Sequence, residues 1–295
     1  SHRARLAAGD TACGTVRESG ASKEIKSMKK MLALPLILAM IFSMTACGEK
    51  SSVVTTVENG EEVYILKMSS TVNEDHLVTK TDRYFIQRVE ELSNGRLKIE
   101  LYPNNQLGDP RSMLEATSMG NLDICDVGLP QYSYYTNALK FFNLPFLWET
   151  RDAAFSFLDT DAGEDIRRQV EEDVGVHILG FQDNGFFGFT SNKLMETPAD
   201  VRGFKVRCQE SDILLQIWSD LGASPMPMSF SEVYTALQQG AIDGQMNAYI
   251  TNYNSGYYEV QQYFHKLGLL YDMMVVGISM ESYNALPEDL QAVLD

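Results

Sequence analysis

The sequence predicts an α/β protein built from two similar lobes. Short apolar runs rich in β-branched residues, typical of strands, alternate along the chain with segments whose apolar residues recur at helical spacing. One unit also occurs twice: residues 113–124 and 233–244 both read as a helix, a glycine, an aliphatic residue and an aspartate. Because Gly240 follows Gly120 by 120 residues, the repeat is too long for a solenoid and indicates two lobes instead.

Composition limits the function classes. The 295 residues are enough for two medium-sized domains, and 44% hydrophobic and 22% charged residues are typical of a folded globular protein. The net charge of −16 argues against a nucleic acid or an anionic membrane surface as partner. An anion site would therefore have to be a local basic pocket in an acidic protein. No two of the four histidines lie at metal-ligand spacing, so a zinc site is not expected. No cofactor is expected either.

The amino-terminal region reads as a secretion signal behind an extension. Residues 1–27 are polar, and we predict that translation starts at Met28. Residues 28–46 combine a basic start, an uncharged apolar core and small residues before Cys47, as a secretory signal peptide does. The junction resembles a bacterial lipobox, so Cys47 is the expected lipidation site; a plain signal peptide is the alternative. Residues 47–62 are expected to be a flexible tether to the outer face of the cytoplasmic membrane, in the cell envelope or periplasm.

The first element of the folded part is expected at Val63–Met68, an apolar run with β-branched residues. Ser70 follows it, and a small hydroxyl residue at a strand's carboxyl end can bind a ligand or cap the next helix. The next elements are a helix from Asp75 to a stop at Asn94, a strand at 97–102, a helix at 111–119 and a helix stop with a strand at 120–127.

The later elements follow the same logic. We expect a helix at 153–174, a buried strand at 176–182, a helix at 232–239, a returning strand at 269–280, and a helix within 281–295 whose amino cap region is 286–290. Cys125 and Cys208 both lie in apolar strand-like runs. Two reduced, buried thiols are expected there, with a disulfide between the lobes as the alternative.

Arg207 is the central candidate for ligand binding. It ends a short alternating run, and an arginine at the mouth of a strand can clamp a carboxylate because its planar fork offers paired donors and keeps its charge. An ion pair between lobes or at the surface is the plain alternative. After Gly240 a short strand brings Gln245 and Asn247 to the same sheet edge, where each amide could contact a ligand or brace the strand.

Several spaced motifs then carry a family resemblance. They are PNNQLG at 103–108, GFKVR at 203–207, LGASPMPM at 221–228, and FSEVYTALQQGAIDGQ at 230–245 with an asparagine at 247. In this order they resemble the solute receptors of TRAP transporters (tripartite ATP-independent periplasmic transporters), over residues 62–295. The resemblance implies a two-lobed, periplasmic-binding-protein-like fold with hinge-connected α/β domains. Lobe 1 would comprise 63–184 plus 273–295 and lobe 2 would comprise 185–272, with a truncated carboxyl end.

The resemblance also implies a function without catalysis. Such a receptor captures an organic acid, a carboxylate or sugar acid, by hinge closure and delivers it to the TRAP membrane permease subunits. Arg207 would clamp the ligand, Asn247 would contact it, and Phe230 would be an aromatic wall or a core residue. Phe187 stands where the family commonly has a second arginine, and Met246 where it usually has a glutamate. Phe187 should make the pocket more apolar, favouring a monocarboxylate or an acid with an apolar or ring portion, and Met246 argues against a metal.

Two other function classes remain as alternatives. A secreted α/β enzyme could use Asp123, Asp126 or Asp243 as acid or base, although no nucleophile motif or phosphate loop is present. A lipoprotein receptor of another importer type is the second alternative.

Overall fold

Nine strands form one sheet in the computed structural model, which describes residues 53–295. The expected α/β class is confirmed. The sheet order is β1-β2-β4-β9-β5-β8-β6-β7, and β3 pairs with β2 on the outside of this path. The strands are β1 Val54–Glu58, β2 Glu61–Ser70, β3 Leu97–Tyr102, β4 Ile124–Gly128, β5 Val176–Ser191, β6 Lys205–Cys208, β7 Ser224–Pro227, β8 Gly244–Ala248 and β9 Tyr263–Ser279.

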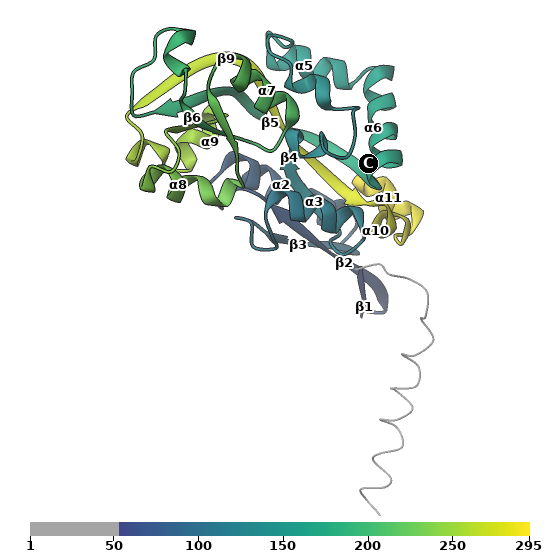
Figure 1. Ribbon diagram of the computed structural model, residues 1–295. Coiled ribbons are helices and arrows are strands. Elements are labelled where there is room, and N and C mark those ends of the chain that lie inside the picture. Colours follow the sequence, from purple (N-terminus) through teal and green to yellow (C-terminus); the bar gives the residue numbers. More distant parts are fainter. Residues whose placement is uncertain (1–52) are drawn as a thin grey trace, which may run out of the picture. The chain divides into compact units, whose positions relative to one another are not determined.

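Helices pack around this sheet (Figure 1). The α-helices are α2 Leu77–Leu92, α3 Pro110–Ser118, α4 Leu129–Tyr132, α5 Arg151–Leu158, α6 Asp161–Val174, α7 Asp212–Asp220, α8 Val233–Gln239, α9 Tyr249–Asn254, α10 Met280–Asn284 and α11 Glu288–Leu294. Short 3-10 turns lie at Lys140–Asn143, Pro198–Val201, Phe230–Glu232 and Tyr257–Glu259. No helix within residues 53–295 is long and apolar enough to cross a bilayer.

The repeated sequence unit is a repeated structural unit. On one side of the sheet β2 pairs in parallel with β4, and on the other side β6 pairs in parallel with β8. We call these the β2–β4 half and the β6–β8 half. Gly120 and Gly240 both have left-handed backbones, with φ of 73° and 69°, which explains why glycine ends both helices. The carboxylates of Asp123 and Asp243 then each accept a 2.8 Å bond from a backbone N–H of the adjacent first strand.

Two long antiparallel strands join the halves. β9 pairs with both β4 and β5, while β5 also pairs with β8. Figure 1 shows β9 as a continuous yellow strand that runs from the side of α8 and α9 to the side of α10 and α11. The β5–β9 register shifts between Asp183 and Gly185 and again between Phe186 and Gly188. Such β-bulges bend a strand without ending it.

Four expectations about elements need correction. The strand expected at 176–182 continues to Ser191, because the glycines are absorbed as bulges. The helix expected at 153–174 is two helices, because the side chain of Thr160 caps a new helix start at the N–H of Gly163. The carboxyl end also forms two helices, α10 and α11, with Pro287 at the N-cap of the second, inside the expected cap region.

The fourth correction concerns the tether. Residues 54–58 form strand β1 and pair with β2, so the tether expected at 47–62 is folded from Val54 onward. Asn59 and Gly60 both have positive φ, 54° and 88°, as a tight hairpin turn requires. Cys47 and the signal peptide lie outside the described residues.

Each half has its own apolar core. Cys125 lies in a cluster with Met113 and Val127, and Cys208 lies in a cluster with Trp218 and Phe189. Both cysteines are free and buried, which confirms the expected pair of reduced thiols. Burial raises the pKa of Cys125 to about 12 and that of Cys208 to about 11, so both thiols are unreactive at neutral pH.

Candidate functional site

A small cavity lies where the parallel strands of the two halves end. Its volume is ≈ 40 Å³, room for only a few water molecules. The carboxyl ends of β2 and β4 face those of β6 and β8 here, which is where open α/β sheets bind ligands. The polar lining residues come from both halves and the joining strands: Thr71, Gln131, Asn184, Arg207, Gln209, Asn247, Thr251 and Asp272.

Arg207 occupies this cavity as a buried cation without a counter-ion. Only 1% of its surface is exposed, and its Nε donates a 3.0 Å bond to the carbonyl of Met228. Its Nη1 has no hydrogen-bond partner, and no carboxylate in residues 53–295 forms an ion pair with it. Burial lowers the pKa of the guanidinium, yet an arginine keeps its charge in proteins. An unpaired buried charge is costly, and an anion beside Arg207 would relieve that cost.

Asn247 and Phe230 line the same cavity. The Asn247 Oδ1 accepts a 3.0 Å bond from the N–H of Ala248, so the side-chain NH₂ is the group that it can offer a ligand. Phe230 and Val72 also line an outer groove of ≈ 320 Å³. Phe230 packs on a small cluster of Val72, Val78 and Met274. These apolar side chains therefore separate the cavity from the groove.

Three other predicted ligand contacts do not line the cavity. Ser70 is fully buried, and its Oγ donates to Asp126 over 3.4 Å. Phe187 is part of the apolar core of the β6–β8 half. Gln245 shares a strand face with Asn247 but lies two residues further from the strand end, where its Nε2 donates to Thr190 over 3.3 Å. None of the three side chains lines the cavity, although the Oε1 of Gln245 is buried without a hydrogen-bond partner.

Several lining residues were not among the sequence predictions. Asn184 and Asp272 entered the sequence analysis only as the last residues of the expected lobe segments 63–184 and 185–272, yet both line the cavity. A single acid inside the apolar run 269–280 was the available sign for Asp272, because an acidic residue is rarely buried without a specific role. No feature of the sequence indicated that the other lining residues Gln131, Gln209 and Thr251 face the cavity.

The aspartates of the enzyme alternative are structural. Asp123 and Asp243 hold the first strand of each half, as described above. Asp126 is fully buried beside Asp82, and the Nε2 of Gln182 donates to Asp82 over 2.6 Å and to Asp126 over 3.4 Å. Burial and the neighbouring Asp82 raise the pKa of Asp126 well above its usual range. None of the three lines the cavity.

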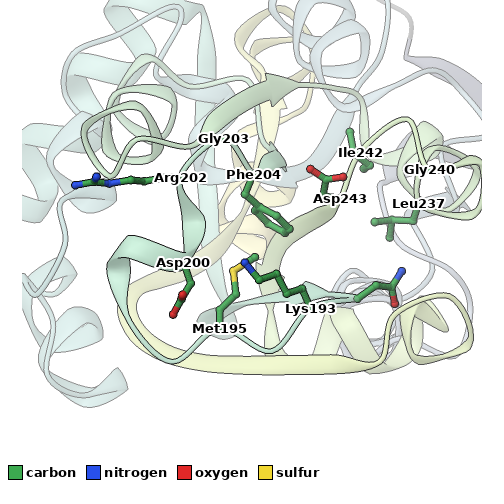
Figure 2. A pocket seen from close by; sticks show the side chains of 11 residues that line it. Lys193, Met195, Asp200, Arg202, Gly203, Phe204, Leu237, Gly240, Ile242 and Asp243 are labelled. Carbon is green, nitrogen blue, oxygen red and sulfur yellow. The ribbon is translucent and has the colours of Figure 1, made fainter.

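A larger hollow of ≈ 410 Å³ lies elsewhere, beside β6 and β8. Figure 2 shows its lining side chains, with Arg202 extending away from the others. The carboxylate of Asp243 accepts from the N–H of Lys205 and that of Asp200 accepts from the N–H of Thr197, each over 2.8 Å. No lining side chain here carries a buried, unpartnered nitrogen or oxygen. The hollow therefore lacks the unmet charge that marks the smaller cavity.

No metal centre emerges from the part of the chain that the structure describes. Its His, Cys, Asp and Glu side chains form no group of three or more that could hold an ion. The chemistry of the cavity is accordingly that of one guanidinium, one carboxyl group, amides and hydroxyls.

Comparison with known proteins shows the family of this chain. The family model described as bacterial extracellular solute-binding protein, family 7, matches residues 68–295. The sequence is 33% identical over 261 residues to the C4-dicarboxylate-binding periplasmic protein DctP of Vibrio cholerae, a match that covers 88% of this chain and 76% of that protein.

Two solved TRAP periplasmic solute binding proteins have the same two-lobed fold. The protein from Polaromonas sp. JS666, bound to D-erythronate, has a TM-score of 0.75 and 28% identity, covering 78% of this chain and 76% of its own. The protein from Sulfurospirillum deleyianum, with bound succinate, has a TM-score of 0.74 and 29% identity, covering 78% and 74%. The chain therefore belongs to family 7 of the bacterial extracellular solute-binding proteins, the receptors that bind carboxylates and sugar acids for TRAP transporters.

Proposed function

We propose that this receptor binds its organic acid in the cavity beside Arg207, with the guanidinium gripping the carboxylate. The observation that carries the proposal is the buried Nη1 without a partner, in a protein whose relatives bind carboxylates. An acid there would replace the missing counter-ion through charge-assisted hydrogen bonds. The NH₂ group of Asn247 would donate to the same acid, and Phe230 would form the apolar wall toward the groove.

Binding would proceed by closure of two lobes. We assign lobe 1 to residues 63–184 plus 273–295 and lobe 2 to residues 185–272, so that both chain crossings fall at the bulged part of the β5–β9 pair. The present cavity holds a few waters at most, so an acid enters only when the lobes move apart. The closed form would then deliver its ligand to the TRAP membrane permease subunits.

The position in the cell follows from the amino-terminal sequence. Lipid attachment at Cys47 would hold the receptor at the outer face of the cytoplasmic membrane, with the polar residues after it as a short tether. Replacing Cys47 by Ala should release the protein from the membrane fraction of cells that express it. Recovery of C47A in the membrane fraction at the wild-type level would rule out this anchor.

A binding screen tests the assignment as a receptor. The protein without its signal peptide should show a raised melting temperature with one or more organic or sugar acids, and NMR should find that acid unchanged after prolonged incubation. The R207M variant should lose the ligand-induced shift, whereas R202M, which changes an exposed arginine outside the cavity, should keep it. A shift retained in R207M would refute the role of Arg207, and consumption of the acid would favour the enzyme alternative.

A further inference from the structure

Asp272 lies in the wall of the cavity that holds Arg207, at the bulge between the joining strands. It is on β9, paired with Gly185 of β5, and only 3% of its surface is exposed. Its Oδ2 accepts a 2.7 Å bond from the Nδ2 of Asn184. Burial is the main influence on this carboxyl group and raises its pKa to about 7, against the opposing effect of the Asn184 bond.

A directed chain of hydrogen bonds ends on this carboxyl group. The N–H of Val78 donates to His76 Nδ1 over 3.2 Å, so the neutral ring carries its proton on Nε2 and donates to Thr251 Oγ1 over 3.2 Å. Thr251 donates to Asn184 Oδ1 over 3.0 Å, which leaves the Asn184 NH₂ to face Asp272. Every side chain in this series of hydrogen bonds is at least 95% buried. The chain thus fixes the Oδ2 of Asp272 as a hydrogen-bond acceptor.

The charges in the cavity are kept apart. Arg207 is the only cation and Asp272 the only acid among the residues that line it, and the two form no ion pair within 4.0 Å. Two opposite charges in one small cavity that do not neutralise each other can each interact with a different part of a ligand. A ligand that matches both would bring a negative charge to Arg207 and a donor, rather than a second anion, to Asp272.

We propose that Asp272 determines the specificity of this site by accepting a hydrogen bond from a hydroxyl of the acid whose carboxylate Arg207 holds. A hydroxylated monocarboxylate satisfies both groups. When Asp272 is ionised, a dicarboxylate would place its second negative charge against the Asp272 carboxylate and is selected against. This inference rests on the proposed function and adds the chemical class of the ligand.

Two sets of acids of matched length test it. The first is erythronate, butyrate and succinate, with four carbons each, and the second is gluconate, hexanoate and adipate, with six. Calorimetry at pH 8, above the raised pKa of Asp272, would compare the wild type with D272N. D183N is the matched control, because Asp183 is the neighbouring acid on the same bulge but points to Tyr271 and Arg151 instead of the cavity.

In the wild type, the hydroxylated acid of at least one set should bind roughly 10-fold or more tightly than its two partners, which is the range for a hydrogen bond to a charged group. D272N should weaken that acid by about 10-fold or more and improve the dicarboxylate, since the Asn amide can donate to a second carboxylate. D183N should leave the order unchanged.

The outcomes also separate this inference from the function on which it rests. If R207M loses every acid but D272N keeps the wild-type order of affinities, Arg207 remains the clamp and the role of Asp272 is refuted. An equal loss of all acids in D272N also refutes it, because it marks a purely structural residue. If no acid binds the wild type, or R207M binds as the wild type does, the proposed function itself fails.

Discussion

The Nε of Arg207 donates to the backbone carbonyl of Met228, and this single 3.0 Å bond holds a charged group in place before any ligand is present. Met228 belongs to the loop that follows β7, so the strand carrying Arg207 and the next loop of the same half together set its direction. A fixed charge needs little reorganisation when an anion arrives. The unpaired buried charge lowers the stability of the protein without a ligand.

One substitution should therefore increase stability and weaken binding. R207M should raise the free energy of unfolding of the empty protein by about 1–4 kcal/mol, because an apolar side chain replaces an unpaired buried charge. The same variant should lose acid binding by at least about 100-fold. Denaturant unfolding followed by circular dichroism measures the first effect, and calorimetry the second. A less stable R207M protein would contradict this account of Arg207.

Removing the ring of Phe230 should open the cavity to the outer groove. Phe230 lines both spaces, so F230A should speed ligand release by about 10-fold or more, while association changes less. Stopped-flow fluorescence with a bound acid would measure both rates. Y253A removes an exposed ring that lines neither space and serves as the control. Unchanged release from F230A would show that the ring is not a barrier.

His76 should make the fold sensitive to acid. Burial lowers its pKa to about 4, whereas the unfolded chain has the ordinary value near 6.5. Between these values the unfolded chain binds more protons than the folded one, so this contribution is complete above about pH 6.5 and is lost as the pH falls toward 4.

The proper comparison is with H76N, whose side chain can still cap α2 but does not titrate. The stability advantage of the wild type over H76N should shrink by a few kcal/mol from pH 7 to pH 4. The comparison of the wild type with H76N is needed because buried carboxyl groups change the stability with pH in the opposite direction. The pKa of Asp272 is raised to about 7 and that of Asp82 to about 6, so both stabilise the fold more as the pH falls through those values. A constant difference would contradict the buried, neutral state of His76.

The two equivalent aspartates should differ in their effect on stability. Asp123 is fully buried and also accepts a 2.7 Å bond from Ser282 Oγ, whereas Asp243 is exposed. D123A should therefore cost about 2–4 kcal/mol and D243A about 1 kcal/mol, because an unmet buried donor is the larger penalty. Acid affinity should change in neither variant. Equal costs would mean that burial does not distinguish the two copies, and lost affinity would assign them a function.

The sequence predicted the fold class and the repeated unit because both depend on local patterns, periodicity and the glycine that ends each helix. It missed the length of β5, since a glycine in a strand reads as a stop until its pairing partner is known. The same limit applies to the site. Residues at strand ends, such as Arg207 and Asn247, were correctly expected to lie together.

The sequence did not show how far from the cavity each residue of a strand lies. Gln245 lies on the same strand face as Asn247, but only the fold shows that it does not line the cavity and that its Nε2 donates to Thr190. Asp272 was missed as a lining residue for a related reason. Its apolar neighbours on β9 predict a buried strand, and only the pairing with β5 places its carboxyl group in the cavity.

The duplicated helix-to-strand unit makes the two walls of the cavity comparable position by position. The aspartates of the unit hold Lys67 in one half and Lys205 in the other, so the counterpart of Arg207 is Ser69. Ser69 is buried and donates its hydroxyl to the sulfur of Met113, so it offers no charge. In the proposed binding mode, the carboxylate of the acid would therefore face Arg207 in the β6–β8 half, and Ser69 offers no equivalent cation for the reversed orientation.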